Sequence, residues 1–201
     1  GKNQPPEFWM WKRLTGTTNS TANTTAIDGS SDYLLLNSTA AAASGVSPWS
    51  TLPTSSVVTV GTNNNDTCNA GDNYIMYSWH SVPGYSKLGS YTGNGSTDGT
   101  YVHLGFRPAW LMVKRTSSTD SWLITDNKRD IDNPATQTQA PQSNREDNVN
   151  TGDNYSIDYL SNGFKCRGSG GDLNGSGQTY LYMAFAEQPN FTNFDTFANA
   201  R

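Results

Sequence analysis

The side chains able to carry acid–base, nucleophilic or metal chemistry are few and scattered. The chain has only two histidines, His80 and His103, so any His-based triad or metal site must use one of them. His80 ends an aromatic run and His103 alternates with apolar residues, positions that favour a hydrogen-bonded or solvent-facing imidazole. The sequence contains no nucleophile elbow, no phosphate-binding Gly-rich loop and no histidine pair at metal-ligand spacing. We therefore expect no catalytic residue and no cofactor.

Carboxylates are the other candidate acids and bases, because glycosidases use two that face each other. Asp126, Asp130, Asp132 and Glu187 fall in loops or at the ends of expected strands, and we interpret them as solvated charges. A calcium site at 130–133 is the alternative, since hard oxygen ligands cluster there. That segment lacks the full ligand spacing of a calcium-binding loop, so the sequence predicts no metal site.

Cysteine usage, charge and hydropathy exclude some classes of protein and leave others open. Cys68 and Cys166 allow one disulfide and match no zinc or redox spacing, so unpaired thiols are favoured while pairing stays open. The formal net charge of −4 argues against the basic stripe of a nucleic-acid-binding protein. No apolar run approaches the roughly 18 residues of a membrane span. The start at Gly1, in mid-motif, suggests a processed chain or part of a longer one.

The sequence blocks that are expected to form the elements positioning these side chains occur twice. Residues 6–13, "PEFWMWKR", match 108–115, "PAWLMVKR", and 73–84, "NYIMYSWHSVPG", match 179–190, "TYLYMAFAEQPN". Between them 55–61 falls opposite 161–168, with Val58 and Val60 facing Phe164 and Cys166. The blocks keep their order, and the offset drifts only from 102 to 106 residues, as a loop insertion would produce. This pattern predicts an internal duplication.

Each repeated block has the composition of a strand. "YIMYSW" and "YLYMAF" are aromatic-rich and apolar at nearly every position, which predicts central strands buried on both faces or strands with one face on a partner. Further strands are expected within 101–106, 121–126 and 155–160, and a helical turn only at 38–44, capped by Ser38 or Thr39. We expect an all-β, antiparallel sandwich or jelly-roll-like fold, internally duplicated. The predicted division is a first repeat at 1–83, incomplete or divergent, a second at 84–189, and a tail at 190–201.

The surface is expected to be made of long polar loops. Only 15% of residues are charged, so Ser, Thr, Asn and Gly must carry solubility, and these residues dominate five segments. In one of them, Asn94-Gly95 and Asp98-Gly99 are expected to supply positive φ angles. The 23 aromatic residues, counted from six Trp, ten Tyr and seven Phe, are mostly inside strand blocks and are assigned to the core. The expected loops are 14–31, 61–73, 89–100, 131–154 and 168–178.

The second half carries motifs that resemble a known family. Residues 84–115, "GYSKLGSYTGNGSTDGTYVHLGFRPAWLMVKR", are followed by "SWLITDNKRD", "LSNGFKCRG", "GQTYLYMAFAEQP" and a terminal "NAR". This set is similar to a β-rich repeat domain of tailed-bacteriophage virion proteins, especially the tail fibre or minor structural proteins of marine phages and cyanophages. The match runs through 84–189 and weakens over 3–83, where Gln4-Pro5 stands opposite Gly105-Phe106. The resemblance implies a β-rich virion component and supplies no catalytic residue.

Three functional hypotheses follow. The first is a non-enzymatic structural and adhesive protein of the virion (tail fibre, tail or capsid decoration), whose loops contact the host surface or other subunits, usually as a symmetric homo-oligomer. The second is a carbohydrate-binding β-sandwich module on a phage or cell-surface filament, which needs aromatic rings on its surface. The third is a depolymerase, which needs converging carboxylates. The first is preferred, with no nucleic-acid partner and no membrane insertion.

Overall fold

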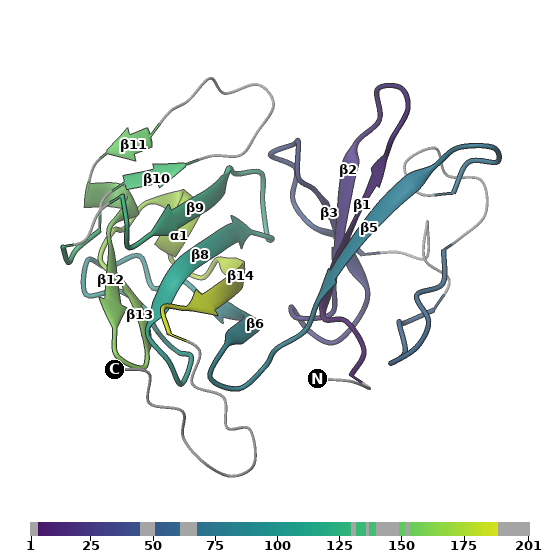
Figure 1. Ribbon diagram of the computed structural model, residues 1–201. Coiled ribbons are helices and arrows are strands. Elements are labelled where there is room, and N and C mark those ends of the chain that lie inside the picture. Colours follow the sequence, from purple (N-terminus) through teal and green to yellow (C-terminus); the bar gives the residue numbers. More distant parts are fainter. Residues whose placement is uncertain are drawn as a thin grey trace, which may run out of the picture.

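The protein is built almost entirely of antiparallel strands in three sheets (Figure 1). The computed structural model describes residues 4–44, 51–60, 68–129, 132–135, 137–139, 149–151 and 153–188. The first sheet contains β1 (Phe8–Arg13), β2 (Ser20–Thr24), β3 (Asp32–Leu35), β4 (Ala43–Ser44) and β5 (Tyr74–Trp79), in the order β4-β3-β2-β1-β5.

The second half of the chain forms the other two sheets. The middle sheet contains β6 (Ser86–Thr92), β8 (Pro108–Arg115), β9 (Trp122–Asp126), β10 (Gln137–Gln139), β11 (Val149–Thr151) and β14 (Thr179–Ala186), in the order β11-β10-β9-β8-β14-β6. The outer sheet contains β7 (Tyr101–His103), β12 (Ile157–Leu160) and β13 (Gly163–Cys166), in the order β12-β13-β7. Two short helices are described, η1 (Asp153–Tyr155) and α1 (Gly171–Asn174).

The middle sheet is covered on both faces. On β14, Tyr180 and Tyr182 point into a core shared with the outer sheet, and Leu181 and Met183 point into a core shared with the first sheet. Successive residues of a strand face opposite sides of its sheet, so an uninterrupted apolar run is what a doubly covered strand requires. The predicted central position of "YLYMAF" is confirmed. The three sheets therefore form a three-layer sandwich, and the predicted all-β class is also confirmed.

The first and middle sheets share their strand order and their register. β1 pairs with β2 from Phe8↔Thr24 to Lys12↔Ser20. β8 pairs with β9 from Trp110↔Asp126 to Lys114↔Trp122. Each residue of the second pair follows its counterpart in the first pair by the same offset of 102 residues. β5 and β14 lie in matching places on the other side, with Arg13↔Tyr74 and Arg115↔Tyr180 in register. The order β4-β3-β2-β1-β5 repeats as β11-β10-β9-β8-β14. These strands are the duplication that the sequence predicts.

The two repeats share one core, and backbone groups connect them. Trp122, fully buried, donates its indole N–H to the Leu35 carbonyl at 3.0 Å. The Asp120 N–H donates to Thr39 at 2.8 Å, and the Ala42 N–H donates to Thr116 at 2.9 Å. The boundary proposed between residues 83 and 84 stays a prediction, and the proposed tail at 190–201 lies outside the described residues.

Several sequence expectations are wrong in the first repeat. Residues 55–60 form no strand, although they were matched with β13, and Val58 and Val60 are half-buried where Phe164 and Cys166 are fully buried. Residues 38–44 form no helical turn, because 43–44 pair with β3 as β4.

Three expected loops also hold regular structure. β2 lies inside 14–31. Its sequence did not indicate a strand, because Ala22 is its one apolar residue. α1 lies inside 168–178, and β10 and β11 lie inside 131–154.

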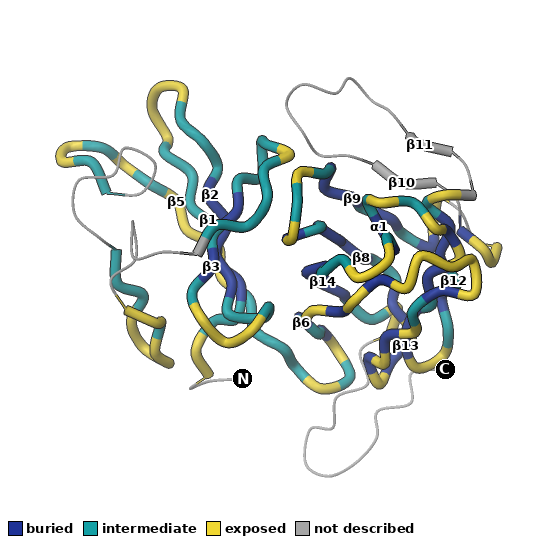
Figure 2. Tube along the Cα trace, turned by 180° about the vertical axis from the view of Figure 1, so that it is seen from behind, coloured by how far each residue is buried: buried dark blue, intermediate teal, exposed yellow. Residues whose placement is uncertain are grey.

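β5 departs from its duplicate in burial. The middle of β14 is buried throughout, whereas Ile75, Met76 and Tyr77 of β5 are 36%, 38% and 48% exposed. Figure 2 shows this strand as exposed along much of its length, in contrast to the buried centre of the middle sheet. β14 lies between β8 and β6 and has a sheet packed on each face, whereas β5 is the last of the described strands in its sheet. The expectation that "YIMYSW" is buried on both faces is therefore wrong.

Candidate functional site

Parts of three expected loops meet at one end of the outer sheet. Asn174, fully buried at the end of α1, donates from Nδ2 to Asn94 Oδ1 at 2.9 Å, to the Ser96 carbonyl at 2.8 Å and to the Gly168 carbonyl at 3.2 Å. Its own Oδ1 accepts the Asn94 N–H at 3.0 Å. The Gly170 N–H donates to the Asn154 carbonyl at 3.2 Å, which adds the third segment. A buried amide with both ends engaged holds these loops in one arrangement.

Two glycines allow the 89–100 segment to approach its neighbours. Gly95 has φ +69, as expected for an Asn-Gly turn. Gly99 does not adopt the positive φ expected of it. A Cβ at Gly99 would instead lie 2.3 Å from the Cys166 carbonyl oxygen, so glycine is required here for close backbone approach.

An open pocket of about 500 Å³ lies beside this junction. The described residues that line it come from the 89–100 turn, from the segment before β12 and from the end of β13. They are Thr97, Asp98, Pro134, Ser156 and Arg167. Because side chains far apart in the sequence form it, no local motif could have predicted the pocket.

Ser156 is the lining residue whose hydrogen bonding is incomplete. It is 2% exposed, and its Oγ has no hydrogen-bond partner among the described residues. Its backbone is fixed, since its carbonyl accepts the N–H of Arg167 at 2.7 Å and of Gly168 at 3.1 Å. A buried hydroxyl without a partner costs about 1–3 kcal/mol. Its Oγ has almost no accessible surface, so a ligand oxygen would reach it only after the pocket lining moves.

The charges around the pocket balance. Arg167 Nε lies 3.4 Å from Asp158 Oδ2, and its Nη1 lies 3.8 Å from Asp98 Oδ1. Lys165 also forms an ion pair with Asp98, and the hydrogen bond and charge of that lysine hold the pKa of the Asp98 carboxyl below its usual value. Two cations face two carboxylates, so the pocket suits a neutral, hydroxyl-bearing ligand better than an ion.

The two histidines do not line this pocket. His80 Nδ1 is 2.9 Å from the Ser81 carbonyl oxygen, and the exposed His103 has Nδ1 3.2 Å from the Tyr101 hydroxyl. Both arrangements fit the structural role expected of the histidines.

The acidic candidates are held by neighbouring side chains and backbone. Asp126 pairs with Arg129 at 3.1 Å, and Glu187 pairs with Arg107 at 3.1 Å. In the segment considered for calcium, Asp132 is exposed. Asn133 Oδ1 accepts the Tyr159 N–H at 2.9 Å, so its oxygen is already engaged. Asp130 lies outside the described residues. Within the described ranges no three His, Cys, Asp or Glu residues lie together as a metal site would require.

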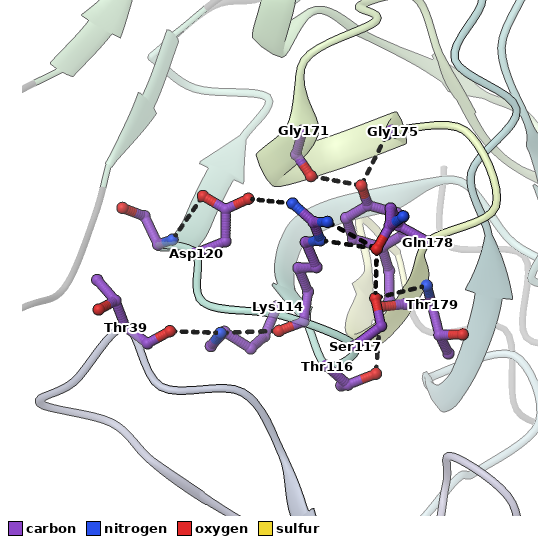
Figure 3. Close-up of polar contacts among 12 residues, drawn as sticks. Thr39, Lys114, Thr116, Ser117, Asp120, Gly171, Gly175, Gln178 and Thr179 are labelled. Carbon is purple, nitrogen blue, oxygen red and sulfur yellow. Dashed lines mark hydrogen bonds and ion pairs between the residues drawn. The ribbon is translucent and has the colours of Figure 1, made fainter.

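A second polar cluster lies where β8 and β14 meet (Figure 3). Arg115 donates from Nη2 to Gln178 Oε1 at 2.6 Å and pairs with Asp120 Oδ2 at 3.2 Å. Ser117 Oγ donates to the same Gln178 oxygen at 2.8 Å. The Tyr180 hydroxyl donates to the Gly171 carbonyl and accepts the Gly175 N–H at 2.7 Å. These bonds join both strands to α1, so the cluster is structural.

Lys114 is the one fully buried lysine of the described chain. Its Nζ donates to the Arg115 carbonyl at 2.7 Å and to the Thr39 carbonyl at 3.3 Å, across the boundary between the repeats. Burial lowers the pKa of this ammonium to about 8, although the carboxylates of Asp120 and Asp172 act in the opposite direction. Its place between the sheets makes it a structural group.

The cysteines do not form a disulfide with each other. Cys166 is fully buried beside the Tyr91 hydroxyl, with Sγ to oxygen 3.9 Å, and burial raises the pKa of this thiol to about 12. A thiol in this state is a poor nucleophile. No described helix has the length and apolar character needed to cross a membrane.

The fold and the pocket define an internally duplicated, three-layer β-sandwich with an open, neutral polar pocket between its loops. Comparison with known families shows that the chain belongs to the family described as a domain of unknown function, DUF7483, whose model matches residues 1–189. No curated protein and no solved structure gives a significant match.

Proposed function

We propose that this protein is a non-enzymatic structural and adhesive component of a bacteriophage virion, in a tail fibre, a tail or a capsid decoration. Its polar loops would contact the host surface or neighbouring virion subunits. The motifs of residues 84–189 that resemble virion repeat domains support this role. A rigid sandwich that displays loops also fits it, because binding residues commonly lie on loops held by a scaffold.

One observation carries the binding part of this proposal. The Ser156 hydroxyl, which has no hydrogen-bond partner among the described residues, is buried beside an open pocket that Thr97 and Arg167 also line. A core serine gains nothing from such a position, since an unsatisfied buried hydroxyl is destabilising. A partner oxygen that reaches this hydroxyl as the pocket lining moves would restore the missing hydrogen bond. We therefore assign host or subunit contact to this end of the second repeat.

Two substitutions test the pocket. Thr97→Trp places a large side chain on an exposed lining residue and should abolish binding of the purified protein to host cells, or to the particle that lacks it. Ser156→Ala should weaken binding while leaving the melting temperature equal or higher, because the buried hydroxyl has no partner to lose. Thr119→Trp, at an exposed position in the β8–β9 turn, is the matched control. Unchanged binding in both pocket variants would exclude this site.

A direct location test addresses the virion role. Antibodies against the protein, labelled with gold and imaged on purified particles, should mark one repeated position on the tail, fibre or capsid. Particles that carry no label, with the protein found only in infected cells, would contradict the proposal.

Glycan binding is a second candidate function, favoured by the neutral, hydroxyl-compatible pocket. Against it, the described pocket lining contains no ring for a sugar to stack on, and the exposed rings of Tyr77, Tyr85 and Tyr101 lie outside that lining. A glycan array separates the two functions, because saturable binding to one glycan that Thr97→Trp removes would establish the carbohydrate module. Incubation with host polysaccharide should release no reducing ends, since we propose no enzymatic activity.

A further inference from the structure

Among the described strands, β5 has a neighbour on one side only. The duplicated sheets show what is missing there. In the middle sheet, β14 has an antiparallel neighbour, β6, along seven register pairs from Thr179↔Thr92 to Phe185↔Ser86. β5 is the duplicate of β14, yet among the described strands it has no partner on that side. The position that β6 occupies in one repeat is thus open in the other.

The backbone of β5 is oriented to accept such a neighbour. The Leu14 N–H donates to the Asn73 carbonyl at 2.9 Å, and hydrogen-bonded pairs alternate along an antiparallel ladder. Ile75 and Tyr77 therefore direct their N–H and C=O groups toward β1. Met76 and Ser78 direct theirs toward the open edge.

The side chains at this edge are uncharged and largely apolar. Edge strands normally carry lysine, proline or a bulge that prevents pairing, and β5 reads Tyr-Ile-Met-Tyr-Ser-Trp, without charge or proline. Beside Met76 and Ser78 lies a pocket of about 230 Å³, bordered by Val57 and Val58. Tyr77 stacks on Trp79 with ring centroids 6.1 Å apart. One face of the strand therefore carries stacked rings, and the other borders a pocket whose lining mixes these valines with polar residues such as Thr54 and Ser56.

We propose that β5 pairs antiparallel with β5 of a second copy, about a two-fold axis at Tyr77. In this register the outward groups of Met76 bond those of Ser78 in the partner, and the two Tyr77 side chains meet at the axis as a cross-strand aromatic pair. An uncharged strand pairs with itself without like-charge repulsion, and a two-fold contact closes as a dimer. The two first sheets would then form one continuous sheet across the dimer.

The inference rests on the proposed function only for the expectation that copies of the chain assemble. Its test is the mass of the purified protein, which is measured apart from host binding, so one can fail without the other. Light scattering behind gel filtration should give twice the 21.8 kDa of the chain. Met76→Lys, which places a charge on the joined edge, should raise the dissociation midpoint at least about tenfold. Ser78→Pro should do the same, because it removes an outward N–H that an edge strand does not need for its own fold.

Two controls show whether the effect is specific to the β5 edge. Leu14→Lys changes a residue that is 61% exposed and apolar but off the edge, and it should dimerise as the unchanged protein does. In a Cys68→Ser background, Tyr77→Cys should form an intermolecular disulfide under mild oxidation, and Leu14→Cys should not. A monomer at every concentration, a dimer indifferent to Met76→Lys, or equal cross-linking at residues 14 and 77 would each overturn the proposal.

Discussion

The substitution Lys114→Met tests the packing between the two repeats. The lysine is 0% exposed, and its ammonium meets only the carbonyls of Arg115 and Thr39 at hydrogen-bond distance. The charged groups that act on it are Asp120 and Asp172, which stabilise the charge, and Arg115, which opposes it. Methionine has a similar length and no charge, so the substitution removes the proton equilibrium while it keeps most of the packing.

The direction of the pH effect on stability follows from the number of protons bound in the folded and unfolded states. The pKa is 10.5 in the unfolded chain and about 8 in the folded protein, so between these values the unfolded chain binds a proton that the folded protein has lost. Unfolding free energy rises with pH wherever the unfolded state binds more protons. The penalty for burying the ammonium is thus complete below pH 8 and is lifted as the pH approaches 10.5. At about 1.4 kcal/mol per pKa unit, the shift corresponds to about 3 kcal/mol.

The measurement is urea unfolding of the unchanged protein and of Lys114→Met from pH 7 to 10.5. The quantity of interest is the difference between the two free energies, which should move by about 3 kcal/mol in favour of the unchanged protein as the pH rises. Burial raises the pKa values of Cys166 and Tyr182 to about 12. Such groups lower stability with rising pH, but they are common to both proteins and cancel in the difference.

A control at the duplicated position isolates the effect. Lys12 occupies the same place in the first repeat, half-buried, with its Nζ donating to the Thr18 carbonyl at 2.8 Å. Lys12→Met should leave the pH-dependent rise unchanged, because Lys114 is still present. A difference curve for Lys114→Met that stays flat from pH 8 to 10.5 would refute the reasoning that burial displaces this proton.

Three further substitutions test the core and the loop end. Trp122→Ala should destabilise the protein by about 3–5 kcal/mol in urea unfolding, because its ring is fully buried between the repeats, and Trp110→Ala should cost less, because that ring is only half-buried. The reverse order would contradict the assigned layers. Asn174→Ala removes the amide that joins the 93–98 segment to 168–174 and should cost about 1–3 kcal/mol and speed hydrogen exchange in 93–98. Unchanged exchange there would show that the loops are held by other contacts.

The strands with strong apolar patterns were predictable from the sequence, and those defined only by their neighbours were not. β8 and β14 are recognisable in the sequence because both faces of each strand are covered, which requires apolar residues in succession. β2 carries Thr and Asn, and its strand state depends on pairing with β1 and β3. β-propensity reflects such context more than the residue itself. The same limit applied to 55–60, where valines alone did not make a strand.

The candidate site was predictable only as a set of loops. The composition of 89–100, 131–154 and 168–178 identified them as polar surface, and Asn94-Gly95 predicted a turn that the structure contains. Their convergence on Ser156 and Arg167 depends on Asn174, which reaches across about 80 residues of chain to Asn94, and no local pattern records such a contact. The same holds for the edge of β5, whose apolar sequence resembles that of β14 although β5 is the last of the described strands in its sheet.

The repeated Lys-Arg pair shows how two copies of one sheet diverged. Arg13 pairs with Asp72 at 2.7 Å, just before β5, and Arg115 bonds Gln178, just before β14. Asp72 and Gln178 differ by 106 residues, the offset that relates β5 to β14, so both arginines anchor the entry to the same strand. In the second copy the carboxylate has become an amide, and Asp120 restores the charge partner from the β8–β9 turn. The anchor is therefore the duplicated feature, and the residue that supplies the charge was free to change.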